Sequence, residues 1–142
     1  MHRQILRLAL LVLVVAVTLS ACPGPAGPDL VPAKAPGNPT FCETDGAGNL
    51  LLYVRNQGDA EASSSEVEVK FLNVRPGYSP VVRATGGTGP LKAGETSASV
   101  ISAGIPEGCF NPDCDFVITV DIVNEVKETN EQNNSVQGAC IG

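Results

Sequence analysis

Short strands separated by turn residues run through most of the chain and indicate its fold class. Glu66–Phe71 alternates polar and apolar side chains with a period of two, which is typical of a strand with one buried face. A glycine- and proline-rich stretch, Gly86–Gly94, is expected to be a loop. No segment sustains apolar residues at helical spacing, so we expect an all-β sandwich of about seven strands. The other expected strands are Leu50–Arg55, Tyr78–Val82, Thr96–Ser102, Phe116–Val123 and Asn134–Cys140.

The N-terminus has the composition of an export signal. Arg3 and Arg7 precede an apolar run from Leu8 to Leu19, which Thr18 alone interrupts. The run of about 12 residues fits the h-region of a secretory signal and is shorter than the roughly 20 residues of a membrane-spanning helix. Ordinary cleavage requires small residues at positions −3 and −1, and cleavage after Ala21 would place Leu19 at −3.

Leu19-Ser20-Ala21-Cys22 instead resembles the lipobox of bacterial prolipoproteins. This resemblance implies removal of residues 1–21 by cleavage between Ala21 and Cys22, a diacylglyceryl group on the Cys22 thiol, and often a further acyl chain, such as palmitate, on the new amine. Two or more chains suffice for stable membrane attachment. The alternative is a cysteine that merely follows a signal peptide. Residue 23 is Pro rather than Asp, so the outer membrane or cell surface is favoured over the inner membrane.

Four cysteines remain after Cys22, and an even number in an exported chain predicts two disulfides. Three pairings are open. The segment between Cys109 and Cys114 contains the turn-forming Asn111-Pro112-Asp113, which favours a bond between these two cysteines and leaves Cys42 to pair with Cys140. A zinc site is the weaker alternative, because the spacing is not C-x₂-C.

Composition narrows the organisation and the function. Six prolines from Pro23 to Pro39 predict a semi-extended tether over residues 22–39, followed by the sandwich over 40–142, although Asp29-Leu30-Val31 could still pair at a sheet edge. The only histidine, His2, lies in the signal, which disfavours histidine-based catalysis and histidine metal sites. Fifteen acidic residues face nine basic ones, two of them in the signal, so we expect no nucleic-acid partner.

Three segments together resemble the CARDB module, a cell-adhesion-related domain found in bacteria. They are Val120-Asp121 with Val126 and Glu128–Asn134, then Val54–Ala60 with its Asn56-Gln57-Gly58 turn, and Leu91–Glu95. Asp29-Leu30-Val31 is similar to the usual start of that module. The resemblance implies an immunoglobulin-like sandwich of seven strands. It also implies a non-catalytic module that contacts proteins or polysaccharides.

The segment 121–134 is rich in side-chain oxygens. The simplest interpretation is a structural turn closed by Asn and Asp side chains. The alternative is a calcium site with Asp121, Asn124, Glu128 and Glu131 as ligands, although no EF-hand-like loop is present. No other cofactor is expected.

The leading function is therefore a lipid-anchored, exported protein that displays one non-catalytic binding or adhesion module. Its binding surface is expected among the loops Asn56–Ser63, Arg83–Gly94 and Gly104–Asp115. A periplasmic accessory or structural lipoprotein of an envelope complex is the alternative. The least favoured alternative is a small hydrolase that uses a carboxylate pair drawn from Asp113, Asp115 and Asp121.

Overall fold

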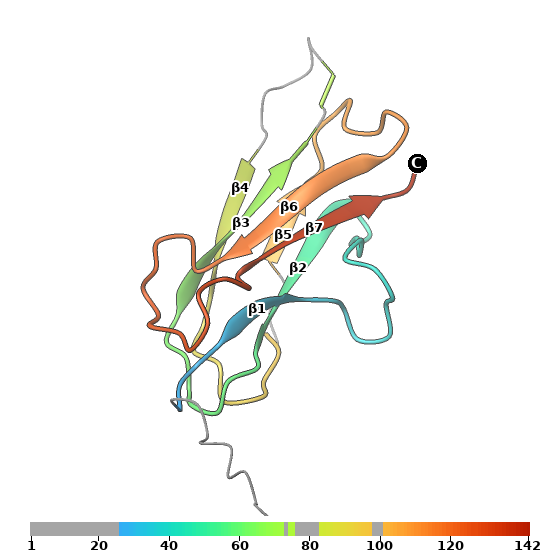
Figure 1. The fold of residues 1–142 in the computed structure, drawn as a ribbon. Helices are drawn as coiled ribbons and strands as arrows, with labels where there is room; N and C mark the ends of the chain where they lie inside the picture. Colours follow the sequence, from blue (N-terminus) through green and yellow to red (C-terminus); the bar gives the residue numbers. More distant parts are fainter. Residues whose placement is uncertain (1–25, 73, 76–82, 98–100) are drawn as a thin grey trace, which may run out of the picture.

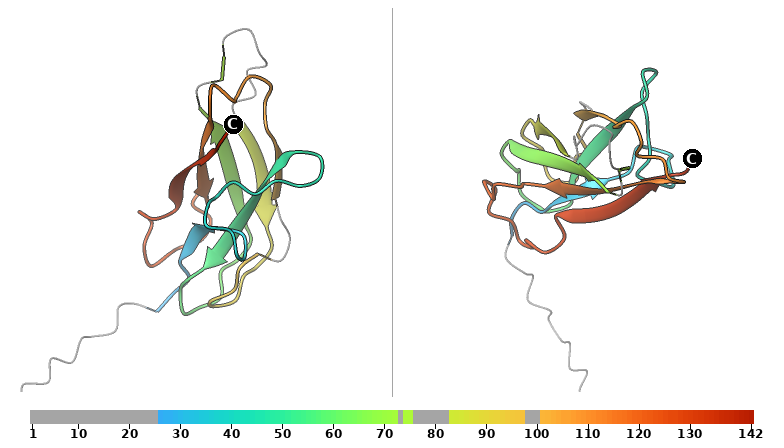
Figure 2. Two further views of the ribbon diagram at one scale, coloured as in Figure 1. Left: turned by 90° about the vertical axis from the view of Figure 1, so that its right-hand side faces the viewer. Right: turned by 90° about the horizontal axis from the view of Figure 1, so that it is seen from above.

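Seven antiparallel strands form two packed sheets (Figure 1, Figure 2). The computed structural model describes residues 26–72, 74–75, 83–97 and 101–142. The three-stranded sheet has the order β1-β2-β5, and the four-stranded sheet has the order β4-β3-β6-β7. The strands are β1 (Leu30–Ala33), β2 (Asn49–Asn56), β3 (Ser65–Phe71), β4 (Arg83–Thr88), β5 (Ile101–Gly104), β6 (Cys114–Val120) and β7 (Ser135–Cys140).

Alternating side chains of the two sheets fill the space between them. In β3 and β6 every second residue is buried, as the period-two pattern predicts. Phe71 and Phe116 lie opposite each other in the β3–β6 register, and their rings meet edge to face with centroids 6.3 Å apart. The Phe116 ring also covers Gly138 of β7, where a Cβ atom would lie 2.5 Å from Cε2 of Phe116. Glycine is therefore required on β7 beneath this ring.

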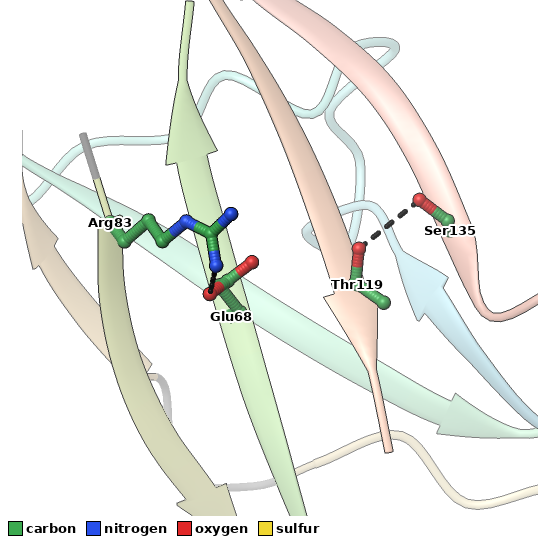
Figure 3. Close-up of polar contacts among 4 residues, drawn as sticks. All are labelled: Glu68, Arg83, Thr119 and Ser135. Atoms are coloured by element: carbon green, nitrogen blue, oxygen red, sulfur yellow. Dashed lines mark hydrogen bonds and ion pairs between the residues drawn. The ribbon is translucent and has the colours of Figure 1, made fainter. Parts of the chain in front are cut away.

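The outer face of the four-stranded sheet is polar and carries cross-strand pairs (Figure 3). Arg83 on β4 and Glu68 on β3 form an ion pair with an N–O distance of 3.2 Å, and the Arg83 side chain is 62% exposed. The Thr119 and Ser135 hydroxyls of β6 and β7 lie 3.2 Å apart. Such exposed pairs contribute less than about 1 kcal/mol each, so this face is a solvated surface.

Both predicted disulfides are present. Cys42, in the connection between β1 and β2, is bonded to Cys140 at the end of β7, with a Cα–Cα distance of 5.1 Å. Cys109 is bonded to Cys114 across a separation of five residues and closes the loop before β6. The first bond joins a loop of the three-stranded sheet to an edge strand of the other sheet.

Several strand predictions need correction. Gly86–Thr88 belongs to β4, because ladder pairing with β3 outweighs the low strand propensity of glycine. β6 ends at Val120 rather than Val123, since Asp121 adopts a positive φ of 48° and turns the chain. Of the expected strand Thr96–Ser102, Thr96 forms an isolated bridge and Ile101 and Ser102 belong to β5, while residues 98–100 lie outside the described residues. The expected strand Tyr78–Val82 lies outside the described residues.

The tether prediction also needs correction at its C-terminal end. β1 pairs with β2 over Leu30–Ala33, and Leu30 is fully buried. The folded domain therefore includes much of the range 22–39 that was predicted to be a tether. The backbone of Asp29-Leu30-Val31 forms hydrogen bonds despite the nearby prolines. Within the described residues, no helix has the length and apolar character needed to cross a membrane. The signal and Cys22 lie outside those residues.

Candidate functional site

The three segments that resemble the CARDB module meet in space around one short stretch of backbone. We call this stretch, Gly27–Leu30, the lead-in segment, because it directly precedes β1. It lies between the loop that joins β2 to β3 and the loop that joins β6 to β7 (Figure 1). Each loop contributes side chains that hold the lead-in segment, so motifs far apart in the sequence act on the same element.

Asn56, at the end of β2, is the central side chain on one side of the lead-in segment. It is fully buried, and both ends of its amide are satisfied. Its Oδ1 accepts hydrogen bonds from the backbone N–H groups of Asp29 (3.1 Å) and Gly58 (3.0 Å). Its Nδ2 donates to the carbonyl oxygens of Ala60 (2.7 Å) and Leu91 (2.9 Å). One amide thus joins the lead-in segment, its own loop and the loop after β4.

Gly58 packs directly against the lead-in backbone. A Cβ atom at this position would collide with the carbonyl oxygen of Gly27 and would lie 2.6 Å from the Asp29 nitrogen. The next residue, Asp59, accepts a hydrogen bond from the Gly27 N–H at Oδ1 (2.7 Å) and donates its own N–H to the Gly27 carbonyl (3.1 Å). The glycine of the Asn-Gln-Gly turn is therefore required by close backbone approach.

The loop between β6 and β7 holds the lead-in segment from the other side. The Thr129 N–H donates to the Pro28 carbonyl (2.9 Å), and Asn133 Nδ2 donates to Asp29 Oδ1 (2.8 Å). These two contacts bridge about 100 residues of sequence, so they add long-range constraints to a segment without regular structure.

Glu128, which is half-buried, holds the end of the lead-in segment. Its Oε2 accepts a hydrogen bond from the Leu30 N–H at the start of β1, and its Oε1 accepts one from Asn134 Nδ2 (2.9 Å). Burial raises the pKa of Glu128 to about 7, and the nearby charges of Glu131 and Asp121 act in the same direction. The Leu30 and Asn134 donors oppose this rise, because they stabilise the ionised carboxylate.

Asp121 shapes the turn that follows β6. Its side chain is buried, and its two carboxylate oxygens accept hydrogen bonds from the backbone N–H groups of Glu125 and Val126, each at 3.0 Å. Asn124, with φ of 54°, donates its N–H to the Asp121 carbonyl. Val126 is buried and serves as the apolar plug of the turn. This arrangement agrees with the structural interpretation of segment 121–134.

Three of the four residues expected to bind calcium nevertheless come together. One carboxylate oxygen from each of Asp121, Glu128 and Glu131 lies within 4.8 Å of the others. Asn124, the fourth expected ligand, is exposed. Glu131 also accepts a hydrogen bond from the Glu128 N–H (2.9 Å). Three acids this close repel one another unless a proton or a cation reduces their charge.

A cleft of about 340 Å³ opens beside this cluster. Residues 26–28 form one wall and Lys127, Glu128 and Thr129 form the other. Of the acids in the cluster, only Glu128 lines the cleft, so the cleft does not present the carboxylate pair that a glycosidase-like site needs.

Asp121 lies far from Asp113 and Asp115, the other two carboxylates considered for a hydrolase. Asp115 is near the start of β6, whereas Asp121 follows its end. Six residues of extended strand span about 20 Å, and Asp113 lies in the loop before β6, beside Gly142. The structure therefore does not bring Asp121 together with Asp113 or Asp115.

Comparison with known protein families identifies the same domain that these motifs indicate. The sequence profile of the CARDB family matches residues 27–138. The chain belongs to the CARDB family. The match begins at Gly27, the first residue of the lead-in segment, so the family includes this segment in the domain. No curated protein matches the chain.

Two solved structures share the CARDB-like fold. One is a domain of a "putative cell surface protein" from Methanosarcina acetivorans, solved by NMR, with a TM-score of 0.56 and 19% identity over 80% of this chain and 90% of that one. The other is the crystal structure of a CARDB domain from Pyrococcus furiosus in complex with di-metal ions. Its TM-score is 0.53 and its identity 21%, over 81% of this chain and 93% of that one.

Sequence reasoning missed the residues that hold the lead-in segment. Asn56 and Gly58 were recognised only as turn residues, and Asn133 only as part of a motif. The available signal was a polar amide at the end of an apolar run, since Asn56 directly follows Leu50–Arg55. The partners of Asn56 could not be deduced, because two of them, Asp29 and Leu91, are 27 and 35 residues away.

Proposed function

We propose that the protein is exported, acylated at Cys22 and held on the outer face of a membrane, where its CARDB domain acts as a non-catalytic binding module. The signal-like residues 1–21 and the lipobox-like Leu19–Cys22 support export and acylation. Two disulfides are consistent with an oxidising compartment. The observation that carries the proposal is the start of the folded domain. It begins at Gly27, five residues after Cys22.

Membrane fractionation with a matched variant tests this proposal. The wild-type precursor is expected in the membrane fraction and to enter the detergent phase on phase separation. Cys22→Ala removes the thiol that receives the lipid, so the variant is expected to leave the membrane or to keep its signal unprocessed. Equal partitioning of the two proteins into the detergent phase with a cleaved signal would contradict acylation at Cys22.

The ligand of the module is proposed to be a protein or a polysaccharide on a neighbouring surface. A role as an accessory lipoprotein of an envelope complex is the alternative, and it differs in the partner. Crosslinking in intact cells discriminates between the two roles. One stoichiometric envelope partner supports the accessory role, whereas labelling of the domain by a membrane-impermeant reagent on whole cells supports surface adhesion.

We propose cation binding at Asp121, Glu128 and Glu131 as a second function, which the convergence of their oxygens favours. The buried Oδ1 atoms of Asn133 and Asn134 accept no hydrogen bond from the described residues, and Asn134 is bonded to Glu128 through its amide nitrogen. Carboxylate and amide oxygens suit calcium. A relative, the Pyrococcus furiosus CARDB domain, was crystallised with di-metal ions.

Thermal unfolding in calcium and in EDTA tests the second function. A ligand that binds only the folded state raises stability by about 2.7 kcal/mol at 100 times its Kd. The wild type is therefore expected to melt at a higher temperature in calcium, and Glu131→Gln is expected to reduce the shift. Glu131 is the most exposed of the three acids, so this substitution perturbs folding least. Identical melting temperatures in calcium and EDTA would exclude a site that is significantly occupied.

A further inference from the structure

The distance between the acylated residue and the folded domain is short. Gly27 is buried and is fixed by two hydrogen bonds to Asp59. Only residues 23–26 separate it from Cys22. A fully extended chain spans at most about 3.6 Å per residue, so the Cα atoms of Cys22 and Gly27 are at most about 18 Å apart. A tether of this length cannot let the domain tumble freely above the bilayer.

The fixed point lies at one end of the sandwich. The loops joining β2 to β3 and β4 to β5 flank it, and they are tied together by the Ala62–Leu91 bridge and by hydrogen bonds from Asn56. The loop of residues 105–113 and the C-terminal Gly142 lie at the opposite end (Figure 1, Figure 2). β2 alone spans eight residues, which corresponds to a length of about 24 Å between the two ends.

From this geometry we infer that the end of the sandwich around Gly27, with the loops 57–64 and 89–97, lies against the lipid headgroups, and that the loop of residues 105–113 points away from the membrane. The occupant of the first surface is the bilayer itself. This inference rests on the proposed acylation at Cys22, and it adds a fixed orientation that anchoring alone does not require.

The charges of the lipid-facing end agree with a surface that lies on the headgroups without inserting. Asp59, Glu61 and Glu95 are exposed there, with Lys92 as a cation beside them. An ionised carboxylate is costly to place in hydrocarbon. Exposed apolar side chains occur at both ends: Val123, 53% exposed, follows β6 near the lipid-facing end, and two others lie at the opposite end. Phe110 is 43% exposed and Ile141 78% exposed.

The orientation selects among the three loops considered for ligand binding. Residues 56–63 and the 89–94 part of Arg83–Gly94 face the lipid, while Gly104–Asp115 remains accessible to another molecule. The Cys109–Cys114 disulfide closes this outward loop around Phe110. The loop is therefore the surface at which the module is expected to contact its ligand.

Single tryptophan reporters can measure the orientation, because the natural sequence contains no tryptophan. Ala93→Trp places a reporter on an exposed turn at the lipid-facing end, and Phe110→Trp is a conservative change at the outward end. Each acylated protein is reconstituted into phosphatidylcholine vesicles with and without a headgroup-labelled spin quencher. Glu61→Trp and Glu107→Trp provide a second pair of reporters at exposed positions if either of the first two variants fails to fold.

We expect strong quenching of the Ala93→Trp reporter and none of the Phe110→Trp reporter. Insertion of about 16 Gly/Ser residues between Pro25 and Ala26 gives a linker with an r.m.s. span of roughly 22 Å and is expected to remove most of the Ala93→Trp quenching. Equal quenching of the two reporters, or no effect of the insertion, overturns the orientation. Mass measurement of the reconstituted protein separates this failure from a failure of acylation, since an unmodified Cys22 overturns the proposed function as well.

Discussion

Asn56→Ala removes the side chain that joins three segments at the end of the domain around Gly27. The substitution leaves two backbone N–H groups and two carbonyl oxygens without their partner. Three of these contacts are partly buried, so water can replace the amide at a net cost of roughly 1 kcal/mol each. The Leu91 carbonyl loses the Asn56 amide but keeps the Ala62 N–H as a donor (2.9 Å), so this contact also costs roughly 1 kcal/mol. We therefore expect the free energy of unfolding to fall by about 4 kcal/mol.

Urea denaturation followed by circular dichroism measures this loss. The mature chain is used with its disulfides intact and with Cys22→Ala, so that lipid does not affect the transition. With an m-value of about 2 kcal/mol/M, the midpoint is expected to drop by about 2 M at unchanged m. Asn130→Ala is the matched control, because Asn130 is exposed and bonds only the Gln132 N–H, and its effect is expected within about 0.5 kcal/mol. A loss below about 1 kcal/mol for Asn56→Ala, equal to that of the control, would refute the central role of Asn56.

Three further predictions follow from the same contacts. Gly58→Ala is expected to cost about 3 kcal/mol in urea denaturation, because its Cβ meets fixed backbone, whereas Gly46→Ala has open space and is expected to be nearly neutral. Similar midpoints for the two variants would contradict the close approach. Burial holds the pKa of Glu128 at about 7, above its unfolded value, so the proton it retains stabilises the folded state fully below about pH 4.5, and this contribution is lost as the pH rises through about 7. Glu128→Gln is expected to flatten the fall in stability between pH 5 and 8, and an unchanged slope would show that another group titrates there. Replacing Cys42 and Cys140 by Ser is expected to lower the free energy of unfolding by about 4–5 kcal/mol on the chain-entropy model, since the closed loop spans 98 residues. A loss of stability under about 1 kcal/mol, measured by calorimetry, would contradict this prediction.

The sequence contained the information that sets the sheets, because that information is local. Alternation in Glu66–Phe71 predicted β3 and its buried face, and the run Leu50–Arg55 predicted most of β2. The disulfide pairing followed from the turn between Cys109 and Cys114, which brought two of the four thiols together and left the other two. In each case neighbouring residues were sufficient for the prediction.

The start of the domain could not be predicted in the same way, because long-range contacts determine it. Prolines between residues 23 and 39 favoured a tether, yet Leu30 is fully buried and Glu128 accepts the hydrogen bond of its N–H. That partner lies 98 residues further along the chain. The same distance concealed the contact between Glu128 and the lead-in segment, although Asp121, Glu128 and Glu131 lie in one short motif.

A short lipid tether at Cys22 that leads directly into a folded CARDB domain is the central claim about this protein. Intact mass spectrometry of the protein extracted from membranes, without reduction, tests it most directly. The predicted mass is that of residues 22–142 with two or three acyl chains on Cys22, less four hydrogens for the two disulfides. An unmodified residue 22, or a chain that retains residues 1–21, would contradict the claim.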